Sequence, residues 1–113
     1  MLNNVILVGR TVEDPKLFKI QDGITVCNMT LAVARPFKSQ ESGEYETDFI
    51  PCVLWRGIAE AVAEHCKKGS TIGVKGRLST KTMEVEGKKI HTLEMIGERV
   101  TFIHLKQEAK AVD

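Results

Sequence analysis

Residues 53–69 read Val53-Leu54-Trp55-Arg56-Gly57-Ile58-Ala59-Glu60-Ala61-Val62-Ala63-Glu64-His65-Cys66-Lys67-Lys68-Gly69, and this stretch decides the fold. Its first three residues end an apolar strand in an aromatic side chain. Residues 58–66 are expected to form one helix, because Ile58, Val62 and Cys66 recur on a single stripe and the charged side chains lie off it. The two lysines suit the C-terminal end of the helix dipole, and Gly69 suits the position just after a helix.

Strands are expected on both sides of this helix. Apolar residues alternate, or fill both phases, over residues 3–11, 25–35, 47–56, 71–81 and 88–103. The pattern predicts an all-β fold with one helix, arranged as a small five-stranded barrel. It also predicts breaks: Pro36 ends the second strand, residues 37–46 form a polar hairpin loop, and Gly97 is a candidate interruption of the fifth strand.

Composition limits the class of protein without choosing its ligand. A chain of 113 residues is one domain, and a net charge of +1 neither supports nor excludes a nucleic-acid partner, so the distribution of charge matters. Three widely spaced cysteines, Cys27, Cys52 and Cys66, indicate buried, reduced thiols in a cytosolic protein. No apolar run approaches the ~20 residues of a membrane helix, and no signal peptide is visible.

Basic residues follow a pattern along the predicted strands. Lys75, Arg77 and Lys81 share one phase of the fourth strand, for which a solvated sheet face is the alternative explanation. Cations also end three apolar strands. On a small barrel, cations at such places can follow a phosphate backbone. The predicted phosphate contacts are therefore Arg10, Arg35, Arg56, Lys75, Arg77 and Lys81.

Four aromatic side chains are candidates for contact with a ligand: Phe18, Phe37, Phe49 and Trp55. An aromatic residue in a small domain is more often part of the core. Phe37, however, falls in the predicted polar loop, where a stacked base explains it better than burial. Phe49 and Trp55 stay open between core and surface, because their strand is apolar on both faces.

Catalytic, metal and cofactor sites are not expected. The three histidines are scattered, no Ser-His-Asp order or paired carboxylates stand out, and no histidine lies at metal-ligand spacing from a cysteine pair. Gly73 and Gly76 lie within a strand, so they fit barrel curvature better than a phosphate-binding loop. The chain is therefore predicted to bind rather than to catalyse, with no cofactor.

Several blocks of sequence together resemble the bacterial single-stranded DNA-binding proteins. They are Asn4-Val5-Ile6-Leu7-Val8-Gly9-Arg10, Asp14-Pro15, Asn28-x-Thr30-Leu31-Ala32, Val53-Leu54-Trp55, Lys68-Gly69-Ser70 and Val74-x-Gly76-Arg77-Leu78. They occur in order from about Leu2 to about Ile103. The resemblance implies an OB-fold over residues 1–105 that binds single-stranded DNA without sequence preference and without enzymatic activity.

The resemblance also implies particular site residues. The family stacks bases on a few aromatics, which fall here on Phe37, Phe49 and Trp55. A fourth stacking position falls on Met83, where a thioether replaces the aromatic ring. The family also implies a homotetramer, and the chain agrees: its first and third strands are apolar on both faces, so Val5, Leu7 and Ile50 are candidates for contacts in a dimer of dimers.

The last residues depart from the family pattern. Residues 106–113 read as a short polar tail that lacks the family's acidic Pro-Phe tip, so few protein partners are expected. A short paralogue, a phage or plasmid version and a chain shortened at its tail all remain open, as do roles in replication, recombination, repair or DNA uptake. The expected location is the cytoplasm, at the nucleoid. The alternatives are an OB-fold that prefers RNA or serves a primosome, and a module that docks protein with its aromatics buried.

Overall fold

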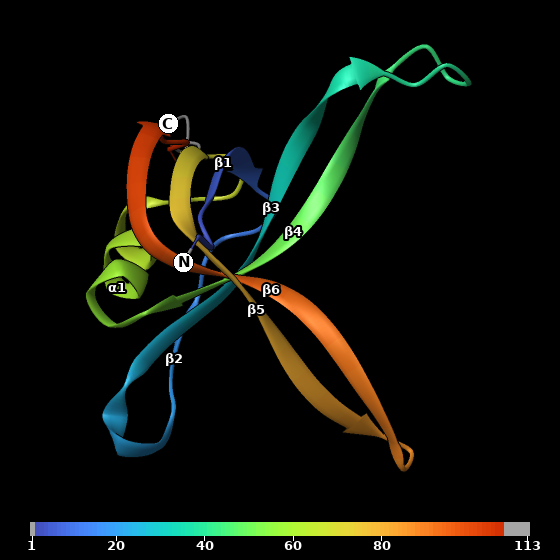
Figure 1. The fold of residues 1–113 in the computed structure, drawn as a ribbon. Coiled ribbons are helices and arrows are strands. Elements are labelled where there is room, and N and C mark those ends of the chain that lie inside the picture. Colours follow the sequence, from blue (N-terminus) through green and yellow to red (C-terminus); the bar gives the residue numbers. More distant parts are fainter. Residues whose placement is uncertain (1, 108–113) are drawn as a thin grey trace, which may run out of the picture.

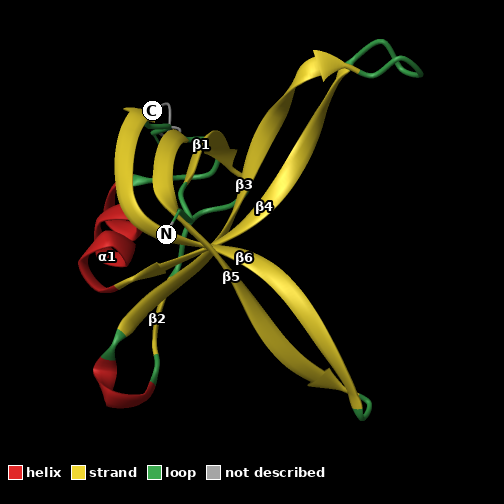
Figure 2. Ribbon diagram, viewed as in Figure 1, coloured by secondary structure: helices red, strands yellow, loops and turns green. Residues whose placement is uncertain are grey.

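The computed structural model of the chain describes residues 2–107. Five long strands and one α-helix build it, with a three-residue strand and a single 3-10 turn between the first two long strands (Figures 1 and 2). In chain order the elements are β1 (Val5–Thr11), β2 (Leu17–Lys19), η1 (Gln21–Gly23), β3 (Thr25–Lys38), β4 (Tyr45–Trp55), α1 (Arg56–His65), β5 (Thr71–Val85) and β6 (Lys88–His104).

The strands form one sheet that curls into a barrel. Their order is β1-β5-β6-β4-β3-β2, and β1 also pairs with β3 where Arg10 lies opposite Ala32, which closes the sheet. β4 and β6 run parallel, and the other pairs are antiparallel. The predicted fold class is confirmed: a barrel of five long strands with one helix, like an OB-fold.

Two hairpins extend from this barrel as arms that point in different directions (Figure 1). The outer parts of β3 and β4 form one arm, and the outer parts of β5 and β6 form the other. Nearly all side chains of the β5–β6 arm beyond Ser79 are exposed. The barrel supplies the packed core, and the arms add surface on two sides of it. The predicted tail, residues 106–113, lies largely outside the described residues.

The core forms because alternate residues of each strand point inward. Leu31 of β3, Leu54 of β4 and Ile72 of β5 are fully buried, and the helix α1 adds Ala59 and Val62 against them. Burying such apolar surface is the main driving force for folding. The complete buried cluster is Cys27, Met29, Leu31, Cys52, Leu54, Ala59, Val62, Cys66, Ile72, Val74 and Met95.

Two predicted breaks are wrong. β3 continues through Pro36 to Lys38, so Phe37 lies in a strand and not in a loop. The register between β3 and β4 shifts between Ala34 and Lys38, and such an irregularity tolerates a proline that cannot donate a ladder hydrogen bond. β6 also continues past Gly97 as one strand, although its register with β5 shifts there.

The crossing of β5 and β6 requires two glycines. Gly76 pairs with Gly97 where the register of β5 and β6 shifts. A Cβ at Gly76 would overlap the carbonyl oxygen of Ile96, and a Cβ at Gly97 would overlap a methyl group of Leu54. At Gly76, therefore, the backbones of β5 and β6 lie closer together than a residue with a Cβ would allow. This agrees with the interpretation of Gly76 as a site of barrel curvature.

The three cysteines are free and buried, as the sequence predicts. The Cys52 Sγ lies 3.9 Å from the Met95 Sδ, and burial raises the pKa of the Cys52 thiol to about 11. Burial also raises the pKa of Cys27 and Cys66. Because the thiolate is the reactive form, these side chains behave as small core residues.

No helix in the described part is long and apolar enough to cross a membrane.

A first prediction concerns the glycine crossing. Gly76→Ala should lower the free energy of unfolding by about 1–3 kcal/mol, because the new methyl group meets backbone that cannot move aside without disturbing the ladder. Chemical denaturation measures the change. Gly57→Ala is the matched control, since a Cβ at Gly57 meets nothing within 4 Å, and it should leave stability unchanged or slightly raised. Equal stability of both variants would contradict the account.

A second prediction concerns the pH dependence of stability. Cys52 has its pKa raised from an ordinary 9.0 to about 11, so the folded state favours the neutral thiol. Its contribution should be complete below about pH 9 and should be lost as the pH rises towards 11. Cys52→Val should flatten this alkaline fall in the free energy of unfolding.

A second measurement tests the burial of Cys52. At pH 8 a thiol reagent should modify the folded chain slowly and the unfolded chain at once. Rapid labelling of folded Cys52 would refute its burial.

Candidate nucleic-acid interface

One face of the β3–β4 pair is turned away from the core and carries the predicted aromatics. Cross-strand partners share a face, and Val26 lies opposite Trp55 while Ala32 lies opposite Phe49. The alternate pairs, such as Cys27 with Leu54, fill the core. We call the outward set the outer strip; its members are Val26, Asn28, Thr30, Ala32, Ala34, Thr47, Phe49, Pro51, Val53 and Trp55.

The question of whether Trp55 and Phe49 belong to the core or the surface is thereby answered. Phe49 is 64% exposed and Trp55 is 39% exposed, although Cys52 and Leu54 of the same strand are buried. They are six residues apart on one face of β4, which separates them by about 20 Å along the strand. The outer strip therefore presents two aromatic side chains to solvent, with small and apolar residues between them.

At the Trp55 end, the strip deepens into a hollow of about 310 Å³. Trp55 and Phe18 both line it, Phe18 coming from the short strand β2, where it lies opposite Val26. Lys81 and Glu94 reach the hollow from the β5–β6 arm. Two half-exposed aromatics and a lysine on three separate elements thus converge here. Among these, the sequence places Trp55 and Lys81 at the site, while Phe18 appears only among the wider aromatic candidates.

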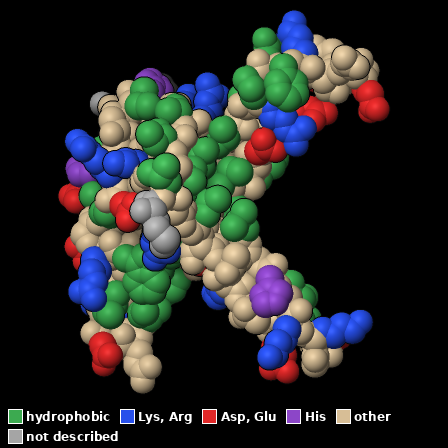
Figure 3. All heavy atoms as spheres, in the orientation of Figure 1, with side chains coloured by type: hydrophobic (Ala, Val, Ile, Leu, Met, Phe, Trp, Pro, Cys, Tyr) green, Lys and Arg blue, Asp and Glu red, His purple; other side chains and the backbone are tan. Residues whose placement is uncertain are grey.

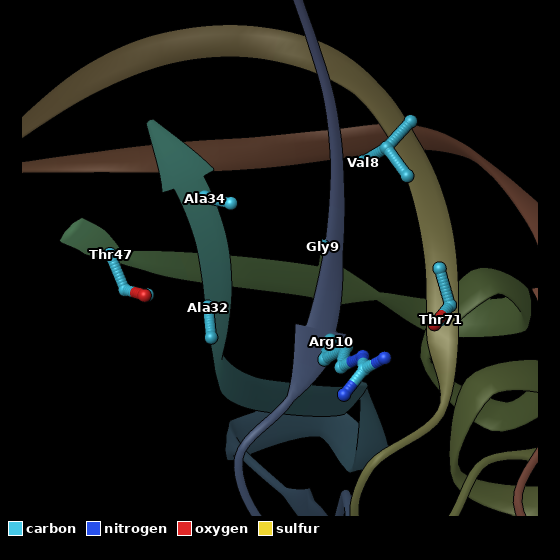
Figure 4. A pocket seen from close by; sticks show the side chains of 7 residues that line it. All are labelled: Val8, Gly9, Arg10, Ala32, Ala34, Thr47 and Thr71. Atoms are coloured by element: carbon cyan, nitrogen blue, oxygen red, sulfur yellow. The ribbon is translucent and has the colours of Figure 1, made fainter. Parts of the chain in front are cut away.

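A second hollow, of about 550 Å³, lies where β1 closes against β3 (Figure 4). Its walls are small side chains, and Arg10 supplies the charge. Gly9 lets β1 approach β3 closely, because a Cβ there would lie 2.7 Å from the carbonyl oxygen of Ala32. Ala32 is the cross-strand partner of both Arg10 and Phe49, so Arg10 lies beside the part of the outer strip that carries Phe49. The lining residues are Val8, Gly9, Arg10, Ala32, Ala34, Thr47 and Thr71.

The remaining predicted cations are exposed, and within residues 2–107 they form no ion pair with an acidic side chain. Lys75 lies opposite Arg99 on β6, a cation that the sequence analysis did not single out. Arg77 follows two residues later on β5. Arg56 directly follows Trp55 and has a left-handed backbone, with φ of 57°. The predicted phosphate contacts without an acidic partner are Arg10, Arg56, Lys75, Arg77 and Lys81.

Arg35 is placed differently. Its Nε and Nη2 donate to Asp48 Oδ1 at 3.0 and 2.9 Å, and its Nη1 donates to Glu46. These hydrogen bonds raise the pKa of Arg35 and lower the pKa of the Asp48 carboxyl. Asp48 lies opposite Val33, which is on the core-side phase of β3, so the pair lies on the other face from Phe49. The structure does not bring Arg35 to the outer strip.

Phe37 and Met83 lie out on the two arms. Phe37 is 67% exposed and belongs to the part of β3 where the register shifts, near the end of its arm. Met83 is 45% exposed and lies opposite Ile90, near the end of the other arm. Neither side chain shares a hollow with Trp55 or Arg10. The predicted site residues therefore spread over the barrel and both arms.

An apolar surface adjoins the outer strip at Pro51 and continues away from it. Hydrophobic side chains gather where the two arms leave the barrel (Figure 3), and an apolar pocket of about 210 Å³ is lined there by Val5, Leu7, Ile50, Pro51, Leu78, Leu93 and Met95, with Glu94 at its margin. On β1, the alternate residues Ile6 and Val8 are 72% and 54% exposed. Both phases of β1 are therefore apolar, as the sequence indicates, and only one of them packs on the core.

A metal-binding cluster is not apparent in the part of the chain that the structure describes. No group of three or more histidine, cysteine, aspartate or glutamate side chains there is placed to hold a metal ion. All buried side-chain nitrogen and oxygen atoms of the described residues have hydrogen-bond partners. What the surface offers is aromatic rings, unpaired cations and apolar contacts.

Comparisons with known proteins agree with this reading. The model of the single-strand binding protein family matches residues 2–103. The chain is 48% identical over 108 residues to single-stranded DNA-binding protein 3 of Listeria innocua, covering 95% of this chain and 67% of that protein. A single-stranded DNA-binding protein of Halalkalibacterium halodurans is 49% identical over 104 residues, 91% of this chain and 61% of its own length.

A further relative matches over its whole length. Single-stranded DNA-binding protein B of Bacillus subtilis is 44% identical over 114 residues, which covers 100% of both chains. The chain thus spans about two thirds of the Listeria relative, 61% of the Halalkalibacterium relative and all of this one.

Proposed function

Because the chain belongs to the single-strand binding protein family, we propose that it binds single-stranded DNA without sequence preference and protects it from pairing and from nucleases. Proteins of this family are non-enzymatic. The proposal includes service in replication, recombination, repair or DNA uptake, in the cytoplasm at the nucleoid. One observation carries it most: the outward face of β4 exposes Trp55 and Phe49, while Cys52 and Leu54 of the same strand are buried in the core of the barrel.

Base stacking on the outer strip is the first part of the mechanism. A base laid against Trp55 in its hollow would contact Phe18 and the apolar wall of Val26 and Val53. A second base would stack on Phe49, and Phe37 and Met83 extend contacts along the arms. Stacking accepts any base, because every base has a π-face. The strip between the aromatics is small or apolar apart from Asn28 and Thr30, so it offers few groups that could read base edges.

Phosphate contacts are the second part. Cations without acidic partners surround the strip: Arg56 beside Trp55, Lys81 in the same hollow, and Arg10 near Phe49. Lys75 and Arg77 continue the charge along β5. Neutralising phosphates releases counterions, so binding should weaken with salt. Arg35 is assigned to bracing the β3–β4 arm, because its Nε, Nη1 and Nη2 each already donate to a carboxylate.

Self-association is the third part. On the side away from β5, β1 pairs with β3 only at its end, at Arg10 and Thr11, so within the described residues the edge at Val5–Val8 has no partner strand. An unpaired edge beside exposed Ile6 and Val8 suits a second copy of the chain, with β1 beside β1 about a two-fold axis. The apolar pocket of Val5, Leu7 and Ile50 supplies a separate surface. Two distinct apolar surfaces support a homotetramer built as a dimer of dimers.

The third prediction tests stacking at Trp55. Trp55→Ala should weaken the binding of fluorescently labelled oligo-dT by about 5- to 150-fold, because stacking contributes ~1–3 kcal/mol per base. Anisotropy of the labelled strand measures this without relying on tryptophan emission. Trp55→Phe should retain most of the affinity.

The matched control for this prediction is Phe102→Ala. Phe102 is 37% exposed, close to the value for Trp55, but it lies against His65 of α1 and away from the outer strip. It should bind oligo-dT like the unaltered chain. If Trp55→Ala keeps full affinity with an intact fold, base stacking at this hollow is not how the protein holds DNA.

The fourth prediction tests self-association through β1. The unaltered chain should sediment at micromolar concentration as a species about four times the 12.6 kDa chain mass. Ile6→Lys should shift it to smaller species, because the ammonium would be buried against the partner strand. Val85→Lys, at a 45% exposed site on the β5–β6 arm, should not. A 12.6 kDa monomer from the unaltered chain would rule out the tetramer.

A further inference from the structure

An exposed aromatic residue on the β3–β4 arm has no role in the mechanism above. Tyr45, the first residue of β4, is 59% exposed. Its cross-strand partner is Lys38, whose Nζ lies 5.7 Å from the centroid of the tyrosine ring. That distance is within the range of a cation–π contact. The ammonium therefore stands over one face of the ring, and more than half of the side chain stays open to solvent.

The alternation of β4 places Tyr45 on the outer strip. Side chains two residues apart on a strand share a face, so Tyr45, Thr47 and Phe49 point to the same side. The register shift near the end of the arm does not alter this, because the extra residues belong to β3. Tyr45 lies about 13 Å beyond Phe49 along the strand, and about 33 Å from Trp55. One face of β4 thus carries three exposed aromatics in line.

The acidic side chains of this part of β4 lie on the face of the arm opposite to the Tyr45 ring. Glu46 and Asp48 alternate with Tyr45 and Thr47, so they point to the other side. Arg35 binds both carboxylates there, which offsets one of their two negative charges and ties the two strands together. Tyr45 is therefore displayed on a braced hairpin. Lys38 adds a positive charge next to it, where the phosphate that follows a stacked base would lie.

We propose that Tyr45 is a further base-stacking position, with Lys38 as its phosphate contact, so that single-stranded DNA runs along the β3–β4 arm beyond Phe49. This inference rests on the proposed function. The strand leaves the protein at Tyr45 rather than rounding the hairpin, because the loop beyond carries Glu41 and Glu44, whose charges repel phosphate. The added contact lengthens the stretch of DNA held by each chain and leaves the tolerance for sequence unchanged.

The experiment compares Tyr45 variants on oligo-dT of two lengths, chosen at the ends of the ~4–16-nucleotide range that one OB-fold covers. Tyr45→Ala should weaken binding of the ~16-mer by at least about fivefold, the lower end of the effect of losing one stacked base. Binding of the ~4-mer, which the Trp55 hollow can hold alone, should not change. Tyr45→Phe should bind like the unaltered chain. Tyr45→Leu keeps apolar bulk without a ring and should lose affinity as the alanine variant does.

Two controls separate the possible outcomes. Thermal unfolding of each variant reports the fold, and Phe102→Ala removes an exposed aromatic that is off the strip. If Tyr45→Ala binds the ~16-mer as the unaltered chain does while Trp55→Ala does not, the inference about Tyr45 is overturned and the proposed function stands. If the unaltered chain binds neither oligonucleotide, the proposed function itself fails and the inference fails with it.

Discussion

The two-residue alternation of β4 is the constraint on which the interface depends. Cys52 and Leu54 must point inward, because the core formed by β3, β5 and the helix closes over them. Val53 and Trp55 must then point outward, and so must Phe49, six residues before Trp55. A slip of one residue would bury the aromatics and expose the core. Packing of the barrel and display of the aromatic face are therefore consequences of the same register.

The glycine crossing of β5 and β6 extends this logic to the rest of the molecule. Because Gly76 and Gly97 have no Cβ, β5 can lie close to the backbone of β6, and β6 can lie close to the side chain of Leu54. β6 then runs parallel beside β4. Beyond this turn, the outer parts of β5 and β6 form an arm. Lys81, near the base of that arm, lines the same hollow as Trp55. The barrel thus closes in a way that brings a cation from β5, which β6 separates from β4 in the sheet order, to the aromatic face.

Much of the fold could be predicted from the sequence, because strand and helix periods are local signals. The five strands, the helix before Gly69 and the buried cysteines all follow from apolar spacing. Pro36 misled the prediction, since a proline ends a regular strand but is tolerated where the register shifts. Strand β2 has only three residues, too few for a period to show, so the contribution of Phe18 to the hollow could not be foreseen.

The sequence predicts many of the residues of the site, but not how they are arranged in space. β4 is apolar on both faces, so sequence alone could not decide which phase faces solvent; the register with β3 decides it. Arg35 has the same sequence context as Arg10 and Arg56, yet only the pairing of β3 with β4 places Asp48 and Glu46 beside it. Tyr45 gives no local signal, because it directly follows a polar loop and becomes part of the aromatic line only through the alternation of β4.

The central claim is that DNA lies along the outward face of β3 and β4, and photocrosslinking tests it most directly. Oligo-dT in which one thymine at a time is replaced by 5-iodouracil is bound to the chain and irradiated, and mass spectrometry then locates the attached peptides. The account predicts attachment at Trp55 and Phe49, and none at Phe102 or His65, the exposed ring pair beside α1. Attachment concentrated at Phe102 and His65, with the outer strip unmodified, would contradict it.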